Sequence, residues 1–117
     1  YDEIASVYSA VTGIPMTGEE LRMAGERMSN LARLYNMREG LTRKDDSLPP
    51  RVMNLPIPDG VAKGSLVTQE ELDLLLDDYY EARGWTSDGV PKKKKLKELG
   101  LEEYVGVTAS KEKAKEA

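Results

Sequence analysis

Adjacent acidic pairs are the most frequent candidates for chemistry in this sequence. Four pairs stand out: Glu19–Glu20, Asp45–Asp46, Asp77–Asp78 and Glu102–Glu103. Two facing carboxyl groups could act as a general acid and a general base, but neighbours on a helix point about 100° apart. We therefore interpret Glu19–Glu20 and Asp77–Asp78 as solvated groups or as partners of a helix dipole. Asp45–Asp46 follows Arg43 and Lys44 in a loop, where a turn held by local carboxylate-to-backbone bonds is favoured.

Cysteine and histidine are absent from all 117 residues. Their absence excludes disulfides, tetrahedral zinc sites, cysteine-ligated iron–sulfur clusters, thiol nucleophiles and imidazole-based triads within this chain. The five methionines have no second soft ligand beside them, so we interpret them as fillers of gaps in a core. The residues therefore predict no catalytic, cofactor-binding or metal-binding side chain in this chain.

A lysine run and an aromatic cluster are the remaining candidates for ligand binding. Lys92–Lys95 could attract an anion, but acidic residues follow it and a solvated helix face is favoured. The net charge of -4 also argues against a nucleic-acid partner. Tyr79, Tyr80 and Trp85 surround Arg83 and could stack on a ligand or receive a guanidinium group. Core packing with hydrogen-bonded polar tips is the favoured interpretation.

Four segments have the apolar spacing of helices and must position these groups. We expect helices at residues 2–12, from Thr17 to the terminating segment Arg38–Gly40, from Thr68 to Arg83, and in a short segment that has Pro91 in its first turn and ends at Gly100. Thr17 and Thr68 each precede a glutamate by three residues, which is a capping box. Residues 40–67 contain four prolines, which exclude long helices and predict a long loop.

The fold class that follows is all-α, with three to five helices and one long Pro/Gly-rich loop. We expect residues 1–105 to form one helical domain, anchored at its end by Leu101, Tyr104 and Val105, and residues 106–117 to be a frayed charged tail. No apolar run reaches about 18 residues, and no apolar segment follows a basic N-terminus, so neither a membrane span nor a secretory signal is expected. A reducing cytoplasm is compatible with the lack of cysteine.

Three separated motifs resemble the C-terminal region of the aldehyde ferredoxin oxidoreductase family. Residues 36–49 (NMREGLTRKDDSLP) carry the first resemblance. Residues 78–85 (DYYEARGW), 88–91 (DGVP) and 96–101 (LKELGL) resemble the segment with which these enzymes end. Residues 8–13 (YSAVTG) are similar to the stretch before the second helix. Because the matches follow in order over residues 1 to about 105, and because the chain begins at Tyr1 close to a helix, we expect a piece of a longer protein.

The resemblance implies an oxidoreductase that converts aldehydes to carboxylic acids. In this family, tungsten held by two molybdopterin-type dithiolenes carries the chemistry, and a [4Fe–4S] cluster passes electrons to ferredoxin. The cluster cysteines and much of the pterin-binding surface are expected upstream of Tyr1. The isolated chain should therefore bind no cofactor and be inactive, with a scaffold or channel-wall role beside the upstream domains of the same enzyme.

Four residues in the matched motifs are candidates for domain contacts or for the substrate-channel wall: Arg38, Arg43, Asp46 and Trp85. The same motifs could instead only secure the loop to its helices. Two interpretations of Arg38 are equally favoured. It could contact another domain, or it could be an arginine favourably placed at an ordinary helix end that a glycine terminates. The alternative function is a free-standing interaction module, in which the stripe of Leu72, Leu75, Leu76 and Tyr79 receives a partner helix.

Overall fold

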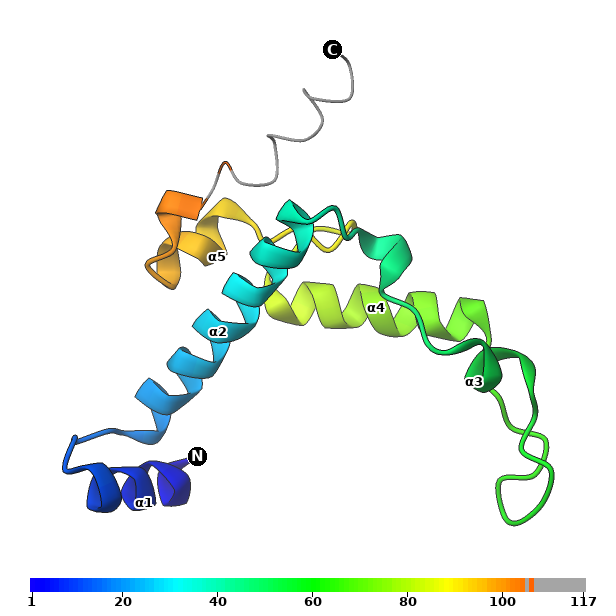
Figure 1. Ribbon diagram of the computed structural model, residues 1–117, viewed down its shortest axis with the longest axis horizontal. Coiled ribbons are helices and arrows are strands. Elements are labelled where there is room, and N and C mark those ends of the chain that lie inside the picture. Colours follow the sequence, from blue (N-terminus) through cyan, green and yellow to red (C-terminus); the bar gives the residue numbers. More distant parts are fainter. Residues whose placement is uncertain (105, 107–117) are drawn as a thin grey trace. The chain divides into compact units, whose positions relative to one another are not determined.

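The chain folds into helices joined by turns and one long connection. The computed structural model describes residues 1–104 and 106. Its elements are α1 (Asp2–Thr12), α2 (Gly18–Arg38), the 3-10 helix η1 (Arg43–Asp45), α3 (Pro50–Asn54), α4 (Gln69–Arg83), α5 (Lys93–Glu98) and the 3-10 helix η2 (Glu102–Tyr104) (Figure 1). Within these described residues there is no strand, only one isolated bridge. The predicted all-α class is confirmed.

The chain divides into two compact units. The first unit holds residues 1–40 and the segment from Lys93 onward, and the second holds residues 41–92. The anchor expected at Val105 and the tail expected at 106–117 lie outside the described residues, apart from Gly106. In the described part of the chain, no helix is both long enough and apolar enough to cross a membrane.

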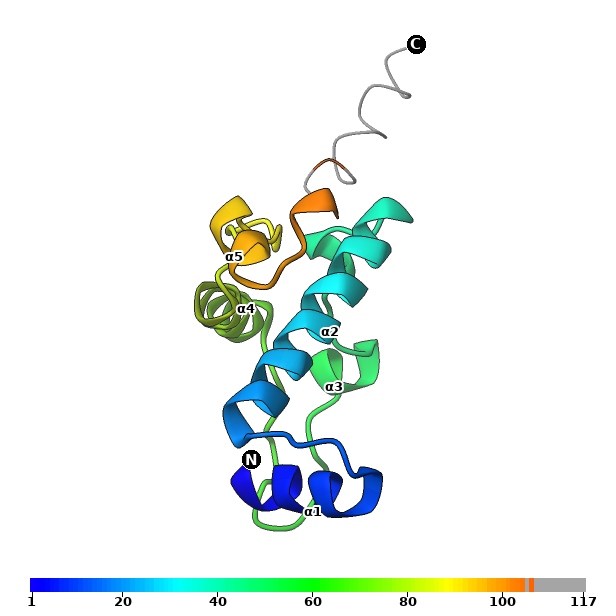
Figure 2. The same ribbon diagram turned by 90° about the vertical axis from the view of Figure 1, so that its left-hand side faces the viewer.

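In the first unit, local signals set the bounds of α1 and α2 as the sequence predicts. α1 ends where Gly13 adopts a φ of 73°. α2 begins with a capping box, in which Glu20 N–H donates to the Thr17 hydroxyl at 3.2 Å and Thr17 N–H donates to the Glu20 carboxylate at 2.8 Å. The bond from the Thr17 N–H and a second one from the Thr17 hydroxyl to the carboxylate lower the pKa of Glu20. α1 packs at the N-terminal end of α2 (Figure 2).

Four leucines form the core of the first unit. Leu34 of α2 packs with Leu96, Leu99 and Leu101, and Tyr104 lies partly buried against them. Lys95 Nζ lies 3.6 Å from Glu26 Oε2 of α2. The prediction that the whole lysine run is a solvated helix face is therefore wrong for Lys95. The reason is that α5 turns Lys95 and Leu96 toward α2, while Lys92–Lys94 remain exposed. The apolar stripe of α1 at Ile4, Val7 and Val11 is exposed in this chain.

In the second unit, the long connection is more structured than the sequence predicts. It contains η1 and the short helix α3, which starts at Pro50. Proline suits the first helical position because its missing N–H would have no helical partner there. Farther on, Ile57 N–H donates to Ser65 O at 3.0 Å and Gly64 N–H donates to Ile57 O at 2.8 Å. These bonds close the segment into an ordered loop.

α4 and the turn after it complete the second unit. Thr68 and Glu71 form the predicted capping box, and Gly84, with a φ of 71°, ends the helix. The prediction that Pro91 lies in the first turn of the last helix is wrong. Pro91 instead forms an antiparallel bridge with Trp85, and Lys92 N–H donates to Gly84 O at 3.2 Å, so α5 begins only at Lys93.

Candidate functional site around Arg43 and Tyr80

Arg43 is held at the start of a tight turn within the second unit. Thr42 N–H donates to Asp45 Oδ2 at 2.7 Å, and Asp45 N–H donates to Thr42 O at 3.0 Å. Together these bonds cap η1 and fix the direction in which Arg43 leaves the backbone. The prediction of local carboxylate-to-backbone bonds is therefore confirmed for Asp45.

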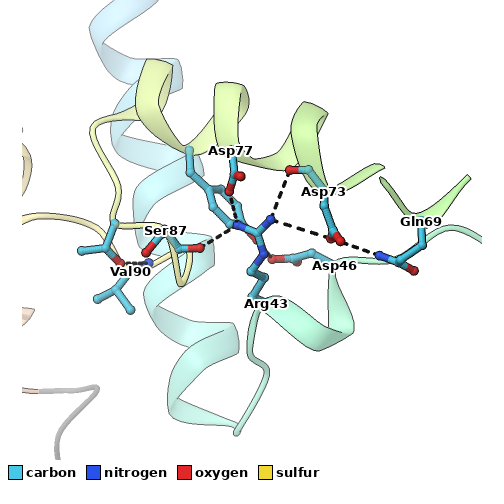
Figure 3. A network of polar contacts seen from close by, with 9 residues as sticks. Arg43, Asp46, Gln69, Asp73, Asp77, Ser87 and Val90 are labelled. Atoms are coloured by element: carbon cyan, nitrogen blue, oxygen red, sulfur yellow. Dashed lines mark hydrogen bonds and ion pairs between the residues drawn. The ribbon is translucent and has the colours of Figure 1, made fainter. Parts of the chain in front are cut away.

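The guanidinium group of Arg43 joins η1 to α4 and to the turn beyond α4 (Figure 3). Its Nη1 donates to Asp77 Oδ1 at 2.6 Å and to the carbonyl oxygen of Ser87 at 2.7 Å. Its Nη2 donates to the carbonyl oxygen of Asp73 at 3.1 Å. The hydrogen bond to Asp77 is the largest cause of a raised pKa at Arg43. Arg43 is thus charged and committed to acceptors of its own chain.

Asp46 lies at the end of the same turn and accepts a short hydrogen bond from the hydroxyl of Tyr80. Tyr80 is only 2% exposed, and the Arg43 guanidinium lies 5.3 Å from the centre of its ring. Asp46 therefore makes a contact with a residue 34 positions away, which the prediction of local bonds did not include. The reason is that α4 turns Tyr80 toward the loop, where its buried hydroxyl needs an acceptor.

Trp85 closes the aromatic side of this cluster. Its ring centre lies 5.7 Å from those of Tyr79 and Tyr80, and the ring is nearly buried. Tyr79 remains half exposed and receives the guanidinium of Arg83 at 5.1 Å. Tyr80 and Trp85 therefore pack as a small core, as favoured from the sequence. Tyr79 and Tyr80 also each receive a guanidinium group, from Arg83 and Arg43 respectively.

A hollow of about 380 Å³ adjoins the cluster. It is lined by Asp77, Tyr80, Glu81, Trp85, Thr86, Ser87 and Lys92. Asp77 is bonded to Arg43 and Tyr80 to Asp46, so these two lining residues already serve internal bonds. Among the described residues, no group of three or more Asp, Glu, His or Cys side chains could hold a metal ion. The geometry supports a positioning clamp, which we call the Arg43 clamp (Arg43, Asp46, Asp77 and Tyr80).

Three of the four residues singled out from the sequence meet in this cluster, namely Arg43, Asp46 and Trp85. Arg38 belongs to the first unit. There it lies on the α2 surface, with its Nε 3.1 Å from Glu39 Oε1 and its guanidinium 4.7 Å from the centre of the Tyr35 ring. After α2, Gly40 has a φ of 100°, as a glycine-terminated helix would have.

The sequence reasoning did not identify Asp77 and Tyr80 as partners of the loop. The sequence predicts a solvated Asp77, and the residue is exposed, yet it accepts a hydrogen bond of 2.6 Å from Arg43. A signal was available, because Asp73, Asp77 and Tyr80 recur at the spacing that places residues on one helix face. Such a face is suited to receive an arginine.

Comparison with known proteins places this fold in a family. A family model described as "Aldehyde ferredoxin oxidoreductase, domains 2 & 3" matches residues 1–101. The tungsten-containing aldehyde ferredoxin oxidoreductase of Pyrococcus abyssi is 41% identical over 105 residues, covering 89% of this chain and 17% of that protein. A Pyrococcus furiosus protein named "Aliphatic sulfonate oxidoreductase, WOR-like subunit" is 33% identical over 109 residues, covering 88% of this chain and 17% of that protein.

A solved structure shows the same arrangement of elements. It is described as the active site complex BamBC of benzoyl coenzyme A reductase with 1,5-dienoyl-CoA. The matching chain has a TM-score of 0.68 and 31% identity, covering 88% of this chain and 14% of that one. This chain therefore spans only about a sixth of the length of the relatives that it matches. The resemblance in the three motifs is confirmed, and the chain belongs to the aldehyde ferredoxin oxidoreductase family.

Proposed function

We propose that this chain serves as the C-terminal helical part of a tungsten enzyme that oxidises aldehydes to carboxylic acids. The observation that carries the proposal is the match along residues 1–101 to the family's domains 2 and 3. It is supported by four tungsten-containing aldehyde ferredoxin oxidoreductases that are 37–41% identical to this chain. In the proposed enzyme, electrons pass to ferredoxin, and the enzyme works in the cytoplasm.

The side chains present do not fit the metals of the family. A [4Fe–4S] cluster needs thiolate ligands, and the chain contains no cysteine or histidine. The described residues also lack a cluster of carboxylates that could hold a metal ion. We therefore propose that tungstopterin and the iron–sulfur cluster are held by other parts of the enzyme, and that this chain is inactive alone. Its contribution is to position structure around the active site and to exclude water from it.

Within that role, the matched motifs have different tasks. Arg43, Asp46 and Trp85 direct their polar or aromatic groups toward α4 and its following turn, so we assign them to fixing the loop. A fixed loop can form part of a channel wall without any of the three touching substrate. Arg38 is exposed and remains the candidate for a contact with the upstream domains.

The substrate class rests on the relatives rather than on this site. The names of the relatives include an aliphatic sulfonate oxidoreductase and a benzoyl coenzyme A reductase complex as well as the aldehyde enzymes. The four aldehyde ferredoxin oxidoreductases are more similar in sequence than either of those two, which favours an aldehyde.

The alternative of a free-standing interaction module has weaker support. It needs Leu72, Leu75, Leu76 and Tyr79 as one exposed stripe. Leu72 is buried and Leu76 is partly buried, so only Leu75 and Tyr79 remain open to a partner helix.

A chimera tests the proposed function. This chain would replace the matched 105 residues of the Pyrococcus abyssi relative, and aldehyde-dependent reduction of a viologen dye would be measured. We expect the chimera to be active, and the relative with those residues deleted to be inactive. If the chimera is folded and carries tungsten but oxidises no aldehyde, the assignment to an aldehyde-oxidising enzyme is wrong.

A further inference from the structure

The second unit carries an apolar surface made of two adjoining hollows. One hollow, of about 560 Å³, lies between α3 and residues 65–67, and Arg51 is its only charged lining residue. The other, of about 440 Å³, lies against α4, and Glu71 is its only charged lining residue. Leu66 and Val67 line both hollows, so the two lie side by side. We call this the apolar surface; its main residues are Val52, Leu55, Ile57, Leu66, Leu74 and Leu75.

Backbone hydrogen bonds hold the apolar surface in place. Val67 N–H donates to Val52 O at 3.3 Å, which ties the end of the loop to α3. The paired bonds between Ile57 and the segment 64–65 fix the opposite rim. Leu66 and Val67 lead directly into the capping box at Thr68 that starts α4. The surface is therefore built into the fold and does not depend on a loose loop.

Most of the apolar residues of this surface are exposed to solvent. The side chains of Leu55, Leu74 and Leu75 are 61%, 63% and 62% exposed, and Val52 and Ile57 are also exposed. Contiguous apolar surface of this kind marks an interaction site, because covering it removes apolar area from water. With one positive and one negative group among the lining residues, the surface suits a partner that is aliphatic or aromatic rather than charged.

We propose that the apolar surface is the docking face for the part of the enzyme polypeptide that this chain does not span. The inference rests on the proposed function and deepens it. In the relatives, the matched segment makes up 17% of the protein, and in the solved structure it makes up 14% of the chain. Each of these relatives thus carries a far larger polypeptide beside this fold. The occupant presents apolar side chains to both hollows.

Hydrogen exchange tests the docking face without relying on activity. The chimera described above and the 117-residue chain alone would be compared at the amides of residues 52–55, 57 and 66–67. We expect these amides to exchange at least tenfold more slowly in the chimera, because the docked polypeptide excludes water. Should the chimera not accumulate, the same comparison uses the chain added to the relative that lacks its matched residues.

Three matched variants then assign the protection to the surface. Leu55→Asp and Leu74→Asp should leave the melting temperature of the chain alone unchanged, because both side chains are already mostly exposed. In the chimera, each should remove the added protection and speed proteolysis by roughly tenfold or more, since a charge would be buried. Leu41→Asp is the control, because Leu41 is 41% exposed and lines neither hollow.

The outcomes separate this inference from the proposed function. Protection in a chimera that oxidises no aldehyde would support the docking face and contradict the proposed function. An active chimera with unprotected amides would overturn the docking face and leave the proposed function standing. An equal loss of protection with Leu41→Asp would also overturn it. Dimerisation of the chain alone that is abolished by Leu74→Asp would show a second copy as the occupant and would contradict the inference.

Discussion

At the scale of single residues, the Arg43 clamp explains why a loop motif contains both a basic and an acidic residue. Arg43 bonds to Asp77 and to two backbone carbonyl groups, while Asp46 accepts from the buried hydroxyl of Tyr80. This network favours one loop position, because the buried hydroxyl of Tyr80 would carry a desolvation cost without its acceptor. The clamp therefore positions structure and needs no ligand to account for its composition.

The Tyr80 hydroxyl should contribute measurably to stability. Tyr80→Phe removes the bond to Asp46 and should lower the free energy of unfolding by about 1.5–3 kcal/mol, as for hydrogen bonds to charged groups. Urea denaturation of the 117-residue chain measures this change. Tyr79→Phe is the matched control, because Tyr79 is 45% exposed, and it should change the free energy by much less. Equal effects of the two substitutions would contradict the clamp.

Arg43 should not be replaceable by lysine. Arg43→Lys keeps the positive charge but loses the planar fork that donates to Asp77, Ser87 O and Asp73 O together. We expect a lower melting temperature in thermal unfolding followed by circular dichroism. Arg51→Lys, at an exposed position of the same unit, should leave it unchanged. A melting temperature unaffected by Arg43→Lys would show that charge alone is sufficient.

At the scale of elements, the sequence predicts the structure where the signals are local. Capping boxes and terminal glycines located α1, α2 and α4 closely, because each signal acts within one helical turn. The contact between Asp46 and Tyr80 joins residues 34 positions apart, and no local pattern specifies it. α3 was missed because its five residues are too few to show a helical period. Pro91 was misplaced because proline fits a bridge as well as a helix start.

The capping box of α4 should make stability depend on pH. Bonds from the backbone N–H and then the hydroxyl of Thr68 lower the pKa of Glu71 below its ordinary value of 4.5. A lowered pKa in the folded state means that the contribution is complete above about 4.5 and is lost as the pH falls through the folded-state value. Glu71→Gln should therefore flatten the acid limb in unfolding curves measured at a series of pH values.

The control for this prediction lies in the same helical turn. Glu70→Gln removes a carboxylate at the start of α4 without removing the one that caps Thr68. The acid limb of this variant should stay as steep as that of the unchanged chain. If Glu70→Gln flattens the curve as much as Glu71→Gln does, general charge in the first turn explains the pH dependence.

The junction of α1 and α2 depends on a missing side chain at Gly18. A Cβ there would lie 2.9 Å from the backbone nitrogen of Asp2 and would collide with the Asp2 carboxylate. Gly18→Ala should therefore loosen α1 and speed proteolytic cleavage between the two helices. Gly25→Ala, also in α2, meets nothing within 4 Å and should stabilise the helix by roughly 0.5–1 kcal/mol. A stabilising Gly18→Ala would contradict the packing described.

At the scale of the whole molecule, the two units share a property that supports a larger assembly. The first unit exposes the apolar stripe of α1, and the second exposes the apolar surface proposed for docking. The chain covers 17% of the length of its tungsten-containing relative from Pyrococcus abyssi. It also lacks the cysteine thiolates that an iron–sulfur cluster needs. These observations support the proposal that the chain is a scaffold completed by other parts of a longer protein.

Metal content tests this account most directly. The 117-residue chain and the full-length chimera would each be produced without oxygen, with tungstate and iron supplied, and analysed for tungsten and iron by mass spectrometry. The account predicts stoichiometric tungsten and iron in the chimera and neither metal in the chain alone. Stoichiometric tungsten or iron in the isolated chain would contradict it.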